Sequence, residues 1–151
     1  MESSTFVVRP VANDVEWQQV KAIRQAVFVE EQRCPPVEEW DDYDETSRHL
    51  IGFVKGRPAA TARWRVSSFD DRPAAKLERF AVLRDYRGHG YGRMLVQYAI
   101  DDARRAGFHR FLLHAQAHLE AFYASFGFVR RSPDVFYEAG IPHDVMTLEE
   151  E

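Results

Sequence analysis

The spacing of hydrophobic residues follows a helical period near the start of the chain and an extended period after it. From Asn13 or Asp14, both good N-caps, apolar residues recur at helical spacing to about Glu31. Pro35-Pro36 ends this predicted helix. The acidic stretch, residues 38–45, then predicts an irregular surface loop.

Short extended runs predict β-strands on both sides of this helix. The runs are Phe6 to Arg9, Leu50 to Val54, Ala59 to Val66 and Ala75 to Leu83. Lys55-Gly56-Arg57-Pro58 has the composition of a hairpin turn. Because the connections are short, we expect the last three strands to form an antiparallel meander.

The second half of the chain alternates between helical and extended patterns. The predicted elements are a helix from about Tyr91 to Gly107, a strand over Phe111 to Ala115, a short helix over Leu119 to Phe126, and strands at Phe128-Val129 and Val145 to Leu148. A meander followed by this alternation predicts an α/β protein with a mixed sheet covered by helices. With no repeat or long linker, residues 1–151 are expected to form a single domain.

Composition excludes several classes of protein. No stretch approaches the roughly 18 apolar residues of a membrane span, and residues 1–4 lack the features of a signal peptide, so we expect a cytoplasmic protein without a membrane partner. A net charge of -4 disfavours a nucleic-acid partner, although Arg84, Arg87 and Arg93 form a local basic cluster. The single cysteine, Cys34, excludes an internal disulfide and is expected to be a buried or idle thiol.

A glycine-rich segment, Arg87-Gly88-His89-Gly90-Tyr91-Gly92, joins a predicted strand to a predicted helix. Glycines at alternate positions let backbone amides approach a ligand closely, and the N-terminus of a helix favours negative charge. The segment therefore predicts a ligand that carries phosphates. It lacks the glycine spacing of a dinucleotide fingerprint and the Gly-Lys-Ser/Thr of a P-loop.

Three blocks together resemble the acetyl-CoA signature of the GCN5-related N-acetyltransferase (GNAT) superfamily. They are Leu77 to Val82, Arg87-x-x-Gly90-x-Gly92 and Phe122-Tyr123-x-x-x-Gly127-Phe128. Its ElaA- and YjcF-like bacterial branch is resembled by residues 27–35, by the acidic run ending at His49, and by Gly140-Ile141-Pro142-His143 with Met146. The resemblance implies a GNAT fold with helices on both sheet faces and transfer of an acetyl group from acetyl-CoA to an amine, without a metal.

The resemblance also implies which residues contact acetyl-CoA. Main-chain groups of the strand end would pair with pantetheine and polarise the acetyl carbonyl, and amides of the glycine segment would hold the pyrophosphate. Gln116 would contact pantetheine or hold two strands apart. The implied cofactor-binding residues are Phe80, Ala81, Val82, Arg87, Gly88, His89, Gly90, Tyr91, Gly92, Arg93, Gln116 and Tyr123.

Two side chains are candidate catalytic groups. Tyr123 matches the family position whose hydroxyl protonates the departing thiolate, although a lone tyrosine on such a helix is more often a core residue. Glu78 lies in a strand that otherwise looks buried, where desolvation would raise its pKa and suit it to accept a proton from an ammonium. The alternative for Glu78 is an ion pair with Arg63 or Arg65.

Three histidines have open roles. His114 stands where many relatives carry Asn. This difference supports the alternative that the protein is a CoA-binding module without catalysis. His114 and His118 have the spacing of a metal pair, but the predicted junction between strand and helix separates them. His143 would either transfer a proton at the substrate mouth or pin a turn.

The acceptor is expected to be an amine on a small molecule or a peptide. The acidic stretch, with Glu39, Asp41 and Asp44, would attract a cationic amine or would be ordinary solvated charge. Transfer of a longer acyl group and pairing of strand edges into a homodimer are further possibilities.

Overall fold

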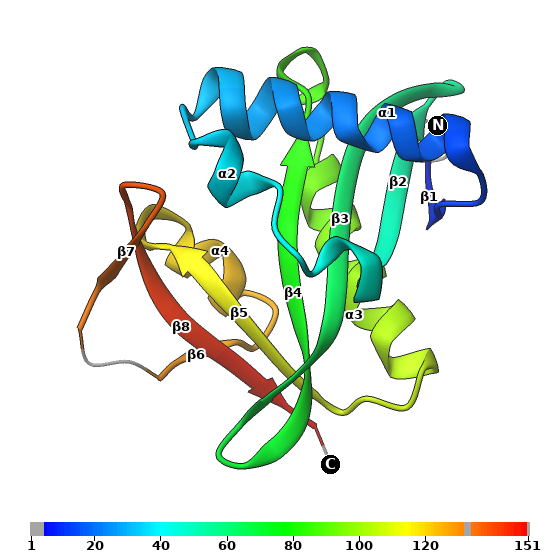
Figure 1. The fold of residues 1–151 in the computed structure, drawn as a ribbon. Helices are drawn as coiled ribbons and strands as arrows, with labels where there is room; N and C mark the ends of the chain where they lie inside the picture. The colour runs from blue at the N-terminus through cyan, green and yellow to red at the C-terminus, as the bar shows by residue number, and fades with distance from the viewer. Residues whose placement is uncertain (1–4, 132–133, 151) are drawn as a thin grey trace.

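The first half of the chain forms a strand, a helical segment and a three-stranded meander (Figure 1). The computed structural model describes residues 5–131 and 134–150. The elements are β1 (Phe6–Pro10), α1 (Asp14–Arg24), a π-helical segment (Gln25–Glu31), α2 (Pro36–Glu39), a 3-10 turn (Asp44–Thr46), β2 (Arg48–Val54), β3 (Arg57–Phe69) and β4 (Arg72–Val82).

The second half alternates helices and strands and closes on a long strand. Its elements are a 3-10 turn (Arg84–Tyr86), α3 (Tyr91–Arg105), β5 (Arg110–Gln116), a 3-10 turn (Ala117–Leu119), α4 (Glu120–Ala124), β6 (Val129–Arg130), β7 (Phe136–Glu138) and β8 (Ile141–Glu149). Within the described residues, the strands form one sheet in the order β1-β2-β3-β4-β5-β8-β6, with β7 also paired to β8. The predicted meander is confirmed, since β2, β3 and β4 pair antiparallel in sequence order.

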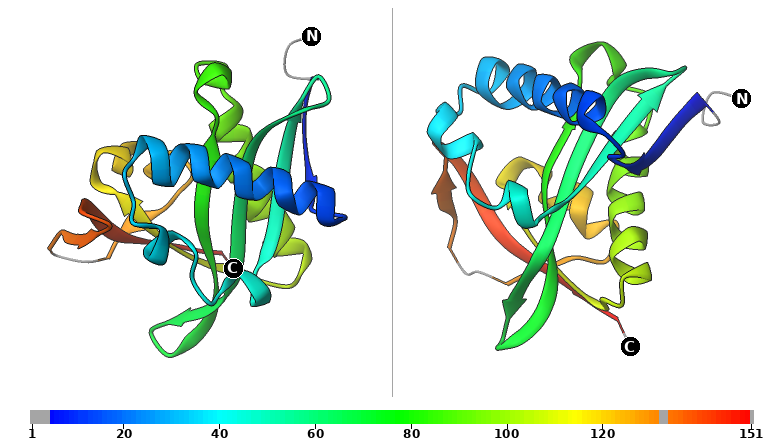
Figure 2. Two further views of the ribbon diagram at one scale, coloured as in Figure 1. Left: turned by 45° about the horizontal axis from the view of Figure 1, so that its top comes forward. Right: turned by 45° about the vertical axis from the view of Figure 1, so that its right-hand side comes forward.

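Helices cover both faces of the sheet, as the resemblance implied. Figure 1 and the turned views in Figure 2 show α1 across one face of the meander and α3 on the opposite face. Beneath α3 the core contains the fully buried Leu77, Leu95 and Phe111, and the rings of Phe6 and Tyr91 stack with centroids 4.5 Å apart. None of the helices in the described residues is long and apolar enough to cross a bilayer.

The structure departs from the sequence-based elements in three places. The first helix is α-helical only to Arg24 and continues as a π-helix to Glu31. The acidic stretch begins with α2, and Glu39 at the end of α2 is buried, so the predicted surface loop is wrong there. A short strand, β7, precedes β8, which begins at Ile141 rather than at Val145.

Gly52 in β2 provides a test of this packing. A β-carbon at Gly52 would lie 2.8 Å from ring atoms of Phe6 and 3.3 Å from the β-carbon of Ala60. The Phe6 ring cannot yield freely because it stacks on Tyr91. We therefore expect Gly52→Ala to lower the free energy of unfolding, measured with urea, by about 1–3 kcal/mol.

Gly92→Ala is the matched control for Gly52→Ala. A β-carbon at Gly92 meets no atom within 4 Å, and alanine favours the helix that begins there. Its stability should be unchanged or raised by up to about 1 kcal/mol. Equal stability of the two variants would contradict the packing described for β1 and β2.

Candidate active site

Strands β4 and β5 are parallel neighbours that pair over only two residues. Ala75 pairs with Phe111 and Lys76 with Leu112, and beyond these pairs the two strands diverge, as Figure 1 shows. A parallel ladder would normally satisfy backbone groups on both strands. The divergence leaves the β5-facing edge of residues 78–82 without a neighbouring strand, and of this edge the Val82 carbonyl accepts from Arg87.

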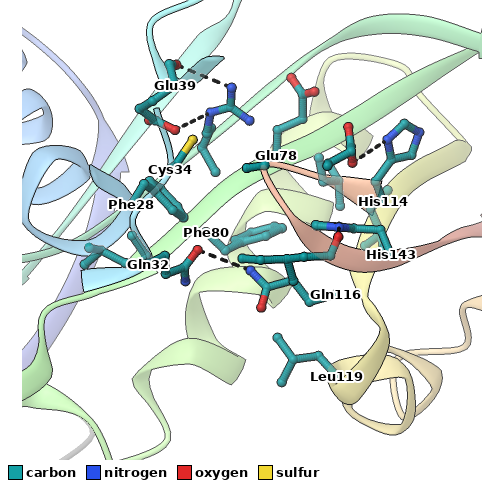
Figure 3. A pocket seen from close by; sticks show the side chains of 18 of the residues that line it. Phe28, Gln32, Cys34, Glu39, Glu78, Phe80, His114, Gln116, Leu119 and His143 are labelled. Atoms are coloured by element: carbon teal, nitrogen blue, oxygen red, sulfur yellow. Dashed lines mark hydrogen bonds and ion pairs between the residues drawn. The ribbon is translucent and has the colours of Figure 1, made fainter. Parts of the chain in front are cut away.

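A β-bulge shapes the diverging part of β4. Thr61 of β3 pairs with Ala81 and Arg63 with Glu78, so Ala62 opposes two residues of β4, Arg79 and Phe80. Arg79 adopts a left-handed conformation with φ of 60°. Such an insertion bends the strand and re-aims its side chains. Here Phe80 points into the opening between β4 and β5 (Figure 3).

A pocket of about 980 Å³ occupies this opening. Its walls come from β4, β5, β8, the π-helical segment, the acidic stretch and the glycine-rich segment. Figure 3 shows labelled side chains of the π-helical segment, the acidic stretch, β4, β5 and β8 around it. Gln116 and Tyr123 line the pocket. So do eight further predicted cofactor-binding residues, namely Phe80, Ala81, Val82, Arg87, Gly88, Gly90, Tyr91 and Gly92.

The glycine-rich segment has the conformation that phosphate binding requires. Gly88 and Gly90 have φ of 84° and 80°, and no atom lies within 4 Å of a β-carbon built at Gly88, Gly90 or Gly92. Gly90 is the N-cap of the 15-residue helix α3. The first amides of a helix have no intrahelical acceptor, so they are available to an anion in the open space beside them.

Arg87, His89 and Arg93 of this region were expected to contact the cofactor, but their side chains are arranged differently. Arg87 donates to both carboxylate oxygens of Glu31, at 2.6 and 2.8 Å, and to the carbonyl of Val82. Arg93 lies over the rings of Phe122 and Phe126. Neither Arg93 nor His89 is among the lining residues, whereas Arg84 and Arg87 both pair with Glu31.

Tyr123 of α4 reaches the pocket from beneath β5. The residue is 7% exposed, and its ring packs against the rings of Phe80, Phe122 and Phe128. Burial raises the pKa of Tyr123 to about 12, so the phenol stays protonated at neutral pH. Among the described residues its hydroxyl has no hydrogen-bond partner, which leaves that proton available to a ligand in the pocket.

Gln116, His114 and His143 lie on the wall formed by β5 and β8. Gln116 pairs in register with His143 and donates its side-chain amide to Gln32 at 3.4 Å. His114 is hydrogen-bonded to Glu138 at 3.1 Å. Within the described residues, no group of three or more His, Cys, Asp or Glu side chains is arranged to hold a metal ion.

Comparison with known proteins decides the family. The model of the acetyltransferase (GNAT) family matches residues 17–128. The chain belongs to the GNAT acetyltransferases. It is 34% identical to the N-acetyltransferase YjcF of Bacillus subtilis, over 80% of this chain and 84% of YjcF. It is 36% identical to ElaA of Escherichia coli, over 84% of this chain and 83% of ElaA.

Solved GNAT structures agree with this family and with the fold. The crystal structure of E. coli ElaA superposes with a TM-score of 0.83 and 30% identity, covering 95% of this chain and 99% of ElaA. An acyl-CoA N-acyltransferase from Pseudomonas aeruginosa gives a TM-score of 0.82 and 29% identity, covering 95% of this chain and 97% of the acyltransferase. The protein is therefore an N-acetyltransferase of the GNAT fold, similar to ElaA and YjcF.

Glu78 of this GNAT protein is an ion-paired carboxylate. Arg65 lies 2.9 Å from it, Arg63 3.0 Å and Lys76 3.2 Å. Burial acts to raise the pKa of Glu78, but these cations outweigh it and the pKa is lowered. The expectation of a raised pKa was wrong, and the alternative of an ion pair with Arg63 or Arg65 is what the structure contains.

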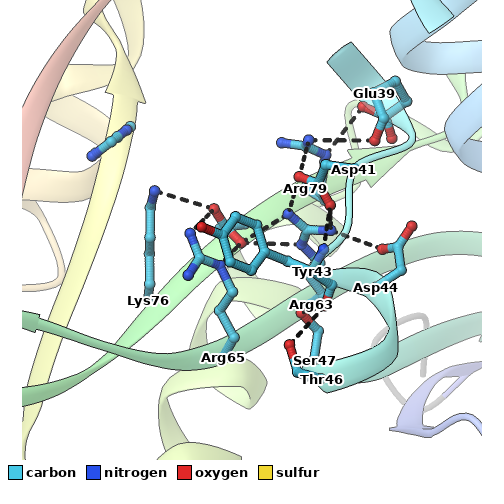
Figure 4. Close-up of polar contacts among 12 residues, drawn as sticks. Glu39, Asp41, Tyr43, Asp44, Thr46, Ser47, Arg63, Arg65, Lys76 and Arg79 are labelled. Carbon is cyan, nitrogen blue, oxygen red and sulfur yellow. Dashed lines mark hydrogen bonds and ion pairs between the residues drawn. The ribbon is translucent and has the colours of Figure 1, made fainter. Parts of the chain in front are cut away.

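The acidic stretch takes part in the same ion-pair network, drawn in Figure 4. Arg63 is 1% exposed and also pairs with Asp41 and Asp44, each at 2.8 Å. Glu39 pairs with Arg24 at 2.6 Å and with Arg79 at 3.1 Å. These carboxylates are therefore ion-paired within the fold, and Glu39, which is 2% exposed, is not the solvated loop charge suggested by the sequence.

Several pocket residues were not among the catalytic or cofactor-binding residues predicted from the sequence. Phe28 and Gln32 reach the pocket from the π-helical segment and the residue after it, and Glu138 reaches it from β7. An extra residue per turn changes which side chains share a helix face, so helical periodicity could not have placed Phe28 and Gln32. Cys34 also lines the pocket, where burial raises the pKa of its thiol.

Asp41→Asn tests the ion-pair network through its pH dependence. Burial acts to raise the pKa of Asp41, but Arg63, the Tyr43 amide and Arg79 lower it from 3.8 to about 2. A carboxylate with a lowered pKa stabilises the fold above its unfolded pKa, and this contribution is lost as the pH falls through the folded value. Asp41→Asn should therefore cost about 2 kcal/mol in urea unfolding at pH 7.

The difference in the free energy of unfolding between wild type and Asp41→Asn should shrink as the pH is lowered from about 4 to about 2. Asp42→Asn is the matched control, because Asp42 is exposed and should show no such loss at any pH. A pH-independent difference for Asp41→Asn would mean that its charge is not what stabilises the loop.

Proposed function

We propose that this protein moves an acetyl group from acetyl-CoA to a primary amine, by direct attack while both substrates are bound. The observation that carries the proposal is the pocket between the diverging strands β4 and β5, which has the glycine-rich segment at one end and Tyr123 beneath it. The acceptor amine and the direct mechanism are the parts that go beyond the family.

The glycine-rich segment would hold the phosphates of the donor. Open amides from Gly88 to Gly92 and the positive end of the α3 dipole suit the pyrophosphate of CoA. The Arg87–Glu31 pair, whose hydrogen bonds lower the pKa of Glu31, fixes the loop in front of the helix. The backbone would thus supply most of the binding here.

The free edge of β4 would orient the thioester. Between the bulge at Arg79 and Val82, main-chain groups face the pocket instead of pairing with β5. An amide aimed at the acetyl carbonyl stabilises the negative charge that develops on oxygen as an amine attacks, by a few kcal/mol per donor. Main-chain donors explain why no side-chain oxyanion group is needed at this edge.

Tyr123 would stabilise the sulfur as the C–S bond breaks. A phenol of pKa about 12 holds its proton more tightly than a thiol, whose ordinary pKa is about 8.5. Tyr123 is therefore better suited to donate a hydrogen bond to the developing thiolate than to give up its proton fully. Its contact with Phe80 places it beside the bulged strand end.

An acceptor screen tests the proposal. The panel is an amino acid, a peptide with a free N-terminus, a lysine side-chain peptide, a polyamine, an aminoglycoside and an amino sugar, each assayed for thiol release from acetyl-CoA. Saturable release with at least one amine supports the proposal. Acetyl-CoA binding without release for any of them would favour a CoA-binding module, and an absence of binding would contradict the site.

Tyr123→Phe removes only the hydroxyl. We expect acetyl-CoA affinity, measured by calorimetry, to stay within a few-fold of wild type and kcat to fall by about 100-fold or more, because the donor acts on charge that develops in the transition state. Tyr98→Phe on α3 is the matched control, since Tyr98 lies against Arg105 and not in the pocket. Equal kcat for Tyr123→Phe and wild type would remove Tyr123 from the reaction.

Gly92→Glu tests the phosphate seat. The side chain enters open space on the lining, so the fold is kept while a carboxylate is placed beside the expected pyrophosphate. We expect acetyl-CoA affinity to fall at least about 10-fold, and less at high salt. Gly92→Gln introduces a side chain of the same size without charge, so its acetyl-CoA affinity should fall clearly less. Equal losses would indicate that bulk, and not charge, is what matters there.

A further inference from the structure

His143 is held on the wall of the pocket near the end of β5. It is the third residue of β8 and pairs in register with Gln116, the last residue of β5. The residue is 9% exposed, and its ring stacks on that of Phe136 and points into the same pocket as Phe80 and Gln116 (Figure 3). The ring therefore has a fixed position facing the opening between the strands.

A hydrogen bond defines the tautomer of this ring. The Nδ1 atom of His143 lies 2.7 Å from the carbonyl oxygen of Ile141. A carbonyl oxygen can only accept, so Nδ1 must carry the hydrogen. In the neutral ring Nε2 is then unprotonated, and its lone pair is available to accept a proton.

Two of the carboxylates that line the pocket, Glu78 and Glu138, are poor alternatives as proton acceptors. Glu78 is held charged by Arg63, Arg65 and Lys76, and its pKa is lowered. Glu138 bonds to His114, and although burial acts to raise the pKa of Glu138, its neighbours His114, His143 and Lys76 lower it. Both carboxylates are thus stabilised in the form that has no proton and are weak bases.

We propose that Nε2 of His143 is the base that deprotonates the acceptor, an assignment that rests on the proposed function. The acceptor binds as an ammonium and gives one proton to Nε2, and the freed nitrogen lone pair forms the bond to the acetyl carbon. The C–S bond breaks and its electron pair leaves on sulfur, which Tyr123 hydrogen-bonds. The second N–H proton goes to the thiolate, and the imidazolium returns its proton to water.

His143→Asn separates this role from a structural one. The Asn amide nitrogen can replace Nδ1 and donate to the Ile141 carbonyl, but no atom then occupies the Nε2 position. The probe is the panel amine that wild type acetylates fastest. At pH 7 we expect kcat/KM for this amine to fall about 100-fold, with the KM for acetyl-CoA unchanged.

The pH dependence is the decisive readout. The loss of kcat/KM in His143→Asn should shrink steadily as the pH is raised towards the pKa of the amine. More of the amine is then already deprotonated when it binds, so no base is needed. Glu138 interacts electrostatically with the ring, Asp144 follows it in the chain, and His114, His118, Lys76 and Tyr137 line the same pocket. If His143 is the base, His114→Asn and His118→Asn should each keep the shape of the wild-type pH profile, whatever their rate. His109→Asn, on an exposed residue away from the pocket, is the control for the substitution itself.

The outcomes distinguish the two proposals. A loss in His143→Asn that is equal at every pH, or no loss, would overturn the assignment of His143 while leaving the acetyltransferase function intact. No turnover by wild type would overturn both. As a readout that needs no substrate, ¹⁵N spectra of the His143 ring, assigned by comparison with His143→Asn, should show a protonated Nδ1 and a bare Nε2, and the opposite tautomer would refute the assignment.

Discussion

The site depends on one constraint, the loss of pairing between β4 and β5 after two residue pairs. Continued pairing would close the edge of β4 with backbone hydrogen bonds and leave no space between the strands. Divergence instead opens a pocket whose walls are main chain on one side and β5 with β8 on the other. The bulge at Arg79 and Phe80 strengthens this opening, because it turns β4 away from its neighbour.

Arg63 links this opening to the rest of the molecule. A nearly fully buried guanidinium is costly unless every charge around it is paired, and Arg63 meets Asp41, Asp44 and Glu78 together. The network ties the acidic stretch to the bulged part of β4. It also holds Glu78, beside the pocket, in ion pairs with Arg63, Arg65 and Lys76.

The sequence predicted the elements whose signals are local. Alternating strands, the hairpin turn at Lys55-Gly56 and the glycine-rich segment were found because each depends on neighbouring residues. The π-helical segment was missed because its extra residue per turn leaves the composition unchanged. The pairing of Glu39 with Arg24 and Arg79 was missed because its partners are far away in the chain. The single domain, the homodimer and the cytoplasmic location stay predictions.

The most direct test of the account is a crystal structure of this protein with CoA. The account predicts that CoA lies between β4 and β5, with its pyrophosphate on the amides from Gly88 to Gly92, pantetheine along the free edge of β4, and sulfur beside the hydroxyl of Tyr123. A complex in which CoA lies outside the opening between β4 and β5, or in which the sulfur is remote from Tyr123, would contradict it.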